Sequence, residues 1–129
     1  MMTANTAATR TAELFRRLDA KDEAGLRALW ADDAQATDEI TRGWIRGPAA
    51  LDAYFRDNLP RISDIHSTID QVAVHAWGEV EVETCVLRQS YVFDGTKLEI
   101  EAPTTTVWRR EGTTWKLAVM HSIPLSAAT

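Results

Sequence analysis

The spacing of apolar residues changes part-way along the chain, and this change constrains the fold more than any other feature. Up to about residue 60 apolar residues recur at helical spacing, and after about residue 65 they alternate, with turn signals between segments. The first half therefore predicts helices and the second half predicts strands. Helices followed by strands with short links favour an α+β domain in which a curved antiparallel sheet packs against the helices.

Three helices are predicted in the first half of the chain. The first runs from Thr9 to about Ala20, and the second follows an N-cap at Asp22 and continues through Trp30. The third begins at Pro48, because proline is favoured in a first helical turn, and it ends at Pro60.

Four strands are predicted in the second half, at about residues 66–77, 79–93, 97–110 and 114–124. Glycines at 78, 95 and 112 mark short turns between them, and short turns join antiparallel neighbours. In the second strand the apolar alternation changes phase after Cys85, which predicts a bulge that bends the sheet there.

Length and charge limit the class of protein. The 129 residues predict a loose tail over residues 1–8 and a single domain over residues 9–125. A net charge of -5 without a basic run argues against nucleic acid as a partner, and no apolar run is long enough to span a membrane. The single cysteine, Cys85, fits a reducing cytoplasm. The three histidines lack ligand spacing and no phosphate-binding glycine motif is present, so neither a metal nor a cofactor is expected.

Several motifs resemble the nuclear transport factor 2-like superfamily, within it the SnoaL-like polyketide cyclases and the ketosteroid isomerases. They are LWADDA at 29–34, GPAAL at 47–51, TTTVWRREG at 104–112 and WKLAVMHS at 115–122. The resemblance implies a cone: a curved, mostly antiparallel mixed sheet wrapped around three N-terminal helices and enclosing a pocket. It also implies a homodimer. Because the superfamily spans enzymes, binding modules and assembly domains, the fold alone does not establish the function.

Asp38 is the first candidate catalytic residue. It follows the predicted second helix and precedes a turn at Gly43, and the resemblance places it at the proton-abstracting aspartate of the ketosteroid isomerases. An apolar pocket would raise the pKa of such a carboxyl group and make it a useful general base. The alternative is an exposed acid at the end of a loop or strand.

The same resemblance indicates that the oxyanion hole of the ketosteroid isomerases is missing from this chain. Ketosteroid isomerases need two hydrogen-bond donors for the developing enolate oxygen, and the matching positions here are Leu14 and Thr105. Leucine donates no hydrogen bond and threonine is a weak donor, so steroid isomerisation by that mechanism is not expected.

His121 is the second candidate catalytic residue, as an acid or a carbonyl-polarising group. It lies in phase with Trp115, Leu117 and Val119, which predicts at least partial burial, and the alternative is a hydrogen-bonded core histidine. The predicted substrate-binding residues are Trp44, Tyr54, Arg88, Tyr91 and Thr105. For Arg88 the alternative is an exposed position on its strand.

Two functions follow from these residues. The first is a small-molecule-binding SnoaL-like protein. As an enzyme it would be a cofactor-independent isomerase, dehydratase or cyclase that acts on an apolar, carbonyl-bearing substrate. The second is a non-catalytic module that binds a ligand or mediates dimerisation, as association domains in the superfamily do. The missing donors and the aromatic residues on the strands favour this second reading.

Overall fold

The helices occupy the first half of the chain. A computed structural model describes residues 2–3 and 8–125. In it α1 spans Arg10–Asp19, α2 spans Glu23–Leu29 and α3 spans Pro48–Asn58, followed by a short 3₁₀ helix, η2, at Leu59–Arg61. Thr9 and Asp22 cap α1 and α2 by accepting backbone N–H bonds, and Pro48 lies in the first turn of α3. The three predicted helices are therefore confirmed, with the second ending one residue early.

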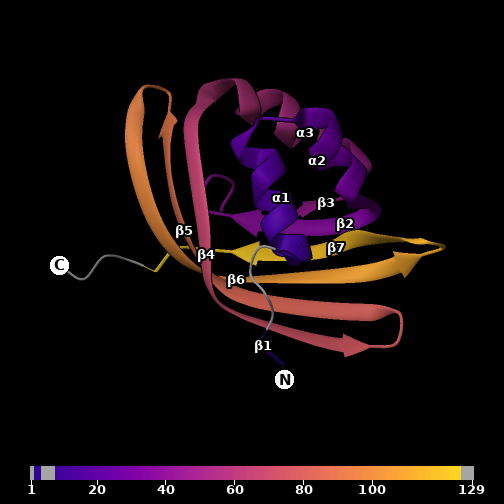
Figure 1. The fold of residues 1–129 in the computed structure, drawn as a ribbon. Coiled ribbons are helices and arrows are strands. Elements are labelled where there is room, and N and C mark those ends of the chain that lie inside the picture. The colour runs from indigo at the N-terminus through magenta and orange to yellow at the C-terminus, as the bar shows by residue number, and fades with distance from the viewer. Residues whose placement is uncertain (1, 4–7, 126–129) are drawn as a thin grey trace.

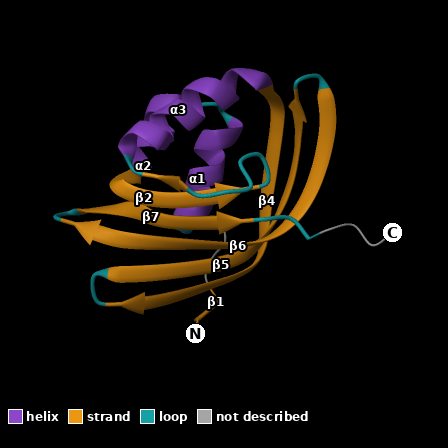
Figure 2. Ribbon diagram, turned by 180° about the vertical axis from the view of Figure 1, so that it is seen from behind, coloured by secondary structure: helices purple, strands orange, loops and turns teal. Residues whose placement is uncertain are grey.

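Seven strands form one curved, open sheet that wraps around the helices (Figures 1 and 2). They are β1 (Met2–Thr3), β2 (Trp30–Asp38), β3 (Ile45–Arg46), β4 (Ile62–Trp77), β5 (Val80–Phe93), β6 (Thr96–Glu111) and β7 (Thr114–Ser122), in the order β1-β4-β5-β6-β7-β2-β3. All neighbours are antiparallel except β2 and β7, which run parallel. The predicted α+β class with a mixed sheet is confirmed, although β2 was not predicted as a strand.

The bend of the sheet comes from β4. Its pairing with β5 shifts at two places, and Asp64 and Gln71 there adopt φ values of 49° and 52°. β5 itself pairs with β6 without any shift, so the bulge predicted after Cys85 is wrong. The apparent change of phase arises because Glu83, a charged residue, is buried on the concave face together with Cys85 and Leu87.

Glu83 is buried beneath the first turn of α1. Its Oε1 accepts hydrogen bonds from the Thr11 backbone N–H at 2.9 Å and the Thr11 hydroxyl at 2.7 Å, and its Oε2 accepts the Arg10 N–H at 3.3 Å. Thr106 lies 2.8 Å from the Thr11 hydroxyl and accepts the indole N–H of Trp108. These bonds use the N–H groups that a helix start leaves unpaired, so Glu83 anchors α1 to the sheet.

A bulge in β7 decides which side chains face the helices. Val107 pairs with Val119 but the next residue, Trp108, pairs with Leu117, so Ala118 is an additional residue in β7. The alternation therefore reverses after Leu117, and His121 points to the convex face and is exposed. The predicted burial of His121 is wrong, because apolar spacing alone gave no sign of the bulge.

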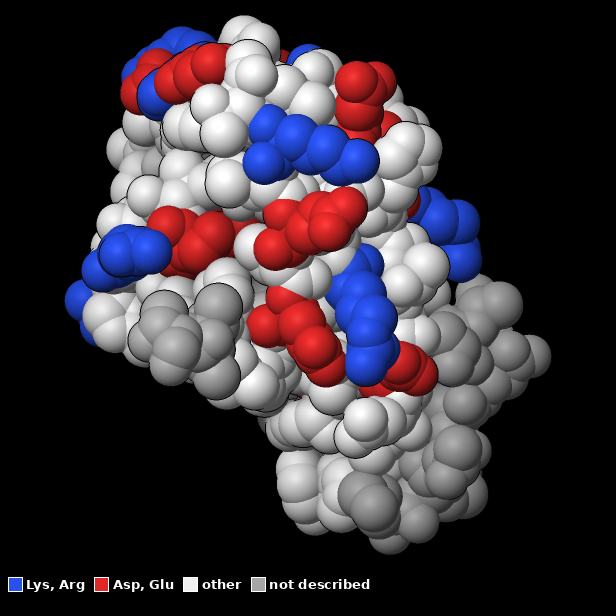
Figure 3. All heavy atoms as spheres, turned by 90° about the vertical axis from the view of Figure 1, so that its left-hand side faces the viewer, with Lys and Arg blue, Asp and Glu red and all other residues white. Residues whose placement is uncertain are grey.

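The start of the chain is described only in part. Of the tail predicted over residues 1–8, Met2 and Thr3 pair as β1 with β4, Ala8 is exposed, and the other residues lie outside the described part. Within the described residues, no helix has the length and apolar character that crossing a membrane requires. On the face shown in Figure 3, acidic and basic side chains lie next to one another rather than gathering into one basic patch.

Candidate functional site

A hollow lies between α1, α3 and the concave face of the sheet, at the end where β2 stops. It is lined by Phe15, Leu18, Asp38, Glu39, Ile40, Tyr54, Phe55, Asn58, Leu59, Ile62, Ile65, Leu87, Gln89, Tyr91, Met120 and Ser122. The centre of a water-sized sphere can move through about 60 Å³ of it, and through about 70 Å³ of an adjoining space that shares Asp38, Tyr54 and Met120. One water needs only about 10–15 Å³ by that measure, so the hollow has room for several waters or one small organic molecule.

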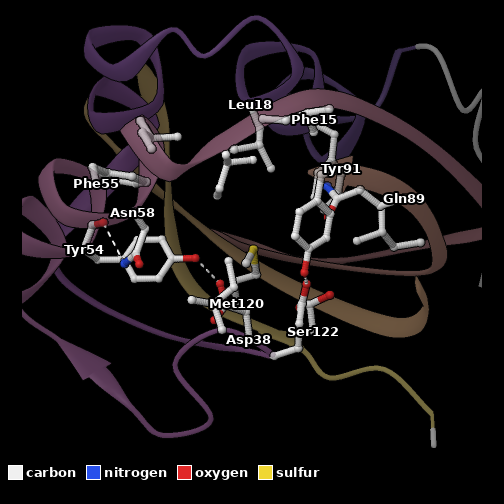
Figure 4. A pocket seen from close by; sticks show the side chains of 16 residues that line it. Phe15, Leu18, Asp38, Tyr54, Phe55, Asn58, Gln89, Tyr91, Met120 and Ser122 are labelled. Carbon is white, nitrogen blue, oxygen red and sulfur yellow. Dashed lines mark hydrogen bonds between the residues drawn. The ribbon is translucent and has the colours of Figure 1, made fainter. Parts of the chain in front are cut away.

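Asp38 lies at the end of β2, where its side chain turns to the concave face. Its Oδ1 accepts the Thr41 backbone N–H at 2.9 Å, and its Oδ2 accepts a short hydrogen bond from the Tyr54 hydroxyl, which α3 supplies from the opposite side (Figure 4). Burial, and then the charge of Asp38, raise the pKa of Tyr54 well above its ordinary value. Tyr54 therefore stays protonated and holds one oxygen of the Asp38 carboxylate in place.

Glu39 forms a second carboxylate–tyrosine pair beside the first. Its Oε1 accepts the Tyr91 hydroxyl at 2.6 Å. Burial raises the pKa of Glu39, and the neighbouring charge of Asp38 adds to the effect, whereas the Tyr91 hydrogen bond and Arg42 oppose it. Burial and Glu39 also raise the pKa of Tyr91. Two adjacent carboxyl groups therefore differ in environment, which is the usual arrangement of an acid and a base in one site.

Sequence reasoning missed Glu39. The available signal was its position directly after Asp38, but alternation in a strand would send the next side chain to the other face of the sheet. The strand ends at Asp38, so Glu39 is free of that alternation and reaches the hydroxyl of Tyr91.

Three further polar residues line the hollow. Asn58 donates through Nδ2 to the Tyr54 carbonyl at 3.0 Å, and Gln89 donates through Nε2 to the Ser67 hydroxyl at 2.9 Å. Ser122 lies 2.8 Å from the Thr104 hydroxyl. Figure 4 shows Tyr54 and Tyr91 on opposite sides of the hollow, with Asp38, Met120 and Ser122 between them.

The predicted site residues separate into two groups. Asp38, Tyr54 and Tyr91 all line the hollow. Trp44 and His121 lie together on the outside, with ring centroids 6.3 Å apart, beside a separate surface depression.

Arg88 and Thr105 also lie away from the hollow. Arg88 is exposed and forms ion pairs with Asp70 and with Glu101, the latter at 3.1 Å, rather than with Asp38. Thr105 pairs across the sheet with His121 and shares its outward face, and Leu14 is buried in the core. Neither position of the missing oxyanion hole therefore offers a donor to the hollow.

Comparisons with known proteins agree with this architecture. Residues 11–117 match the SnoaL-like domain family. The chain belongs to this family. No curated protein matches the sequence of this SnoaL-like domain.

Solved structures with the same fold carry different names. A protein from Rhodospirillum rubrum, described as an NTF2-like protein of unknown function in nutrient uptake, is 23% identical, with a TM-score of 0.77 over 95% of this chain and 100% of its own. A "putative dehydratase" of the NTF2-like family from Streptomyces avermitilis is 18% identical, with a TM-score of 0.78 over 91% and 92%. The hub of a calmodulin-dependent kinase from S. rosetta is 17% identical, with a TM-score of 0.75 over 97% and 100%. At these identities the likeness establishes the fold alone.

Proposed function

We propose that this SnoaL-like domain binds a small, largely apolar carbonyl compound in the hollow and catalyses proton transfer on it without a cofactor. The observation that carries the proposal is the pair of adjacent carboxyl groups, Asp38 and Glu39, each held by a tyrosine hydroxyl at the edge of an otherwise apolar space. Asp38 acts as the base and Glu39 as the acid.

The proposed reaction is proton removal from a carbon next to the carbonyl group. Asp38 takes this proton while Tyr54 and the Thr41 N–H hold its carboxylate. The electron pair of the broken C–H bond forms a carbon–carbon double bond, the π pair of the carbonyl moves to its oxygen, and this oxygen receives the proton of Glu39, so that an enol forms. In both outcomes the enol hydroxyl returns its proton to Glu39 and the carbonyl reforms. If the enol is conjugated with a second double bond, return of the Asp38 proton to the far carbon gives isomerisation. If a hydroxyl group lies on the carbon next to the deprotonated one, it leaves as water with the Asp38 proton, which gives dehydration.

Glu39 takes the role that sequence reasoning assigned to His121. Its raised pKa keeps a larger share of the group protonated than an exposed glutamate would have, and a protonated carboxyl group can donate to a carbonyl oxygen. It thereby supplies the donor that Leu14 and Thr105 do not.

Deuterium exchange tests this proposal without knowledge of the natural substrate. Small cyclic ketones are incubated in D₂O with the wild-type protein, and the loss of the hydrogens next to the carbonyl is followed by NMR. Asp38→Asn is expected to slow exchange by about 100-fold or more, and Glu39→Gln by about tenfold. His121→Ala, outside the hollow, is the matched control and is expected to exchange at the wild-type rate. Equal rates for the wild type and Asp38→Asn would refute the proposal.

A second candidate function is self-association through the convex face of the sheet. Val82, Val86, Val107 and Val119 lie there only partly buried, and Trp77 at its edge is 61% exposed. No described helix covers this face (Figures 1 and 2). The proposed occupant is a second copy of the chain, in line with the hub and association domains among the similar structures.

Sedimentation of the wild type and Val107→Lys tests the second candidate. The wild type is expected to sediment as a dimer at about 100 μM and the variant as a monomer, because a charge would have to be buried. A monomeric wild type would refute self-association and leave the proposed catalysis untouched.

A further inference from the structure

The titratable side chains that line the hollow carry no positive charge. Among the described residues they are Asp38, Glu39, Tyr54 and Tyr91, and the adjoining space adds no lysine, arginine or histidine. The basic side chain that acts on Glu39 is Arg42. Together with Arg61 it lines an open cleft that adjoins the hollow and shares Glu39, Ile40, Asn58 and Tyr91 with it. Arg61 is engaged in an ion pair with Asp94. The hollow therefore presents a negative, partly desolvated surface to its contents.

The hydroxyl groups that line the hollow already donate their hydrogens to acceptors within the protein. Tyr54 donates to Asp38, and Tyr91 donates to Glu39. The Thr104 hydroxyl donates to the Ala102 carbonyl at 3.0 Å, so in the contact between Thr104 and Ser122 the hydrogen belongs to Ser122. Each of these hydroxyl oxygens can still accept a hydrogen bond but can donate no further one without breaking a bond.

The two amides are the exception. Asn58 donates one N–H to the backbone carbonyl of Tyr54 and Gln89 donates one to the Ser67 hydroxyl, so each amide keeps one N–H and its oxygen. These amides, and Glu39 when it is protonated, are the groups that can donate a hydrogen bond to a carbonyl oxygen of the ligand. The carboxylates, the hydroxyl oxygens and the amide oxygens require hydrogen-bond donors from the ligand.

We infer that the ligand carries an ammonium group on a small apolar body and that anions are excluded. An ammonium group supplies three donors and a positive charge, and it would face two carboxyl groups and the rings of Tyr54, Tyr91, Phe15 and Phe55. Inside the hollow a carboxylate or phosphate would meet carboxyl groups and no basic lining residue, since Arg42 and Arg61 line only the adjoining cleft. This inference rests on the proposed function and narrows its substrate class to amino-carbonyl compounds of about one ring in size.

A series of six-membered rings isolates the group that matters, because the apolar body is the same throughout. Cyclohexylammonium, cyclohexanol, cyclohexanone and cyclohexanecarboxylate are titrated against the wild type at neutral pH, with NMR shifts of the protein as the readout. We expect cyclohexylammonium to bind about tenfold more tightly than cyclohexanol, and the carboxylate to bind most weakly.

Two variants assign the preference to the hollow. Asp38→Asn is expected to weaken cyclohexylammonium binding by about tenfold, and Glu39→Gln by less, because Glu39 is partly protonated in the wild type. Both variants are expected to change cyclohexanol binding by less than about twofold. Arg88→Ala changes the charge of the protein on the convex face and is expected to leave all four affinities unchanged. Thermal unfolding of each variant establishes that it is folded.

Cyclohexylammonium binding no tighter than cyclohexanol, or not detectable at about 10 mM, would overturn the inference. So would an ammonium preference that survives in both Asp38→Asn and Glu39→Gln. Deuterium exchange that depends on Asp38 without an ammonium preference would remove only this inference. An ammonium preference without exchange would remove only the proposed catalysis.

Discussion

Carboxyl groups are withdrawn from solvent in two regions of the molecule, and their hydrogen bonding differs between the two. Beneath the start of α1, Glu83 is 2% exposed and accepts three hydrogen bonds from Arg10 and Thr11. Beside the hollow, Asp38 accepts two hydrogen bonds and Glu39 accepts one from a side chain, and both border open space. A carboxylate whose acceptor positions are filled by a helix start stabilises the fold, whereas one that retains free lone pairs beside a hollow is available for chemistry.

Replacement of Glu83 is expected to have the largest effect on stability. Glu83→Ala leaves the N–H groups of Arg10 and Thr11 without their acceptor and is expected to reduce the free energy of unfolding by about 3 kcal/mol. Urea denaturation measures the loss. Glu83→Gln, which keeps the size and one oxygen, is the control and should lose less. A loss for Glu83→Ala below about 1 kcal/mol would show that the region beneath α1 does not depend on this carboxylate.

Removal of the Tyr91 hydroxyl tests the carboxyl groups beside the hollow. Tyr91→Phe removes a hydrogen bond that holds the pKa of Glu39 down, so that pKa is expected to rise further, while stability falls by only about 1 kcal/mol. An NMR titration with carbon-13-labelled glutamate follows the carboxyl group. Tyr54→Phe, whose hydroxyl bonds Asp38 instead, should leave the titration of Glu39 near its wild-type position. An unchanged Glu39 titration in Tyr91→Phe would contradict the hydrogen bond.

The pH dependence of stability separates the two regions with a smaller effect. Because the folded state raises the pKa of Glu39 above 4.5, Glu39 favours folding most when it is protonated, and that contribution is lost as the pH rises through the raised pKa. Glu39→Gln does not titrate, so its Tm relative to the wild type is expected to increase by a few degrees between pH 4 and pH 8. Differential scanning calorimetry at both pH values measures this difference. A constant difference across the range would count against the burial of Glu39.

Arg88 provides the smallest expected effect. Its ion pairs with Asp70 and Glu101 are exposed to solvent, so Arg88→Ala is expected to change the free energy of unfolding by less than about 1 kcal/mol, as measured in urea. A loss comparable with that of Glu83→Ala would mean that exposed charges on the convex face stabilise this domain as much as the buried network does.

The helices and long strands could be predicted because their signals are local. Asp22 and Pro48 mark helix starts through capping and a fixed φ angle, and glycine turns separate the strands of the hairpins. β2 could not be predicted in this way, since it contains Asp32, Asp33 and Gln35 and owes its strand conformation to pairing with β7.

The site could be predicted only in part. Asp38, Tyr54 and Tyr91 were placed near a pocket and do line the hollow, while their roles remain proposals. Trp44, Arg88, Thr105 and His121 were placed there too and lie outside it. For His121 the reason is the bulge in β7, which apolar spacing did not show. Arg88 and Thr105 lie on the convex face of β5 and β6, which pair without a shift, and Trp44 lies in the loop before β3.

The bulge at Ala118 makes one residue responsible for which side chains of the last strand reach the interior. Regular pairing of β7 with Ala118 retained and the bulge lost would restore uninterrupted alternation beyond Leu117 and rotate the imidazole of His121 inward, with Met120 and Ser122 turned out. A lineage of such chains can therefore exchange the reactive groups of its interior by gaining or losing a bulge, without replacing the residues that carry them.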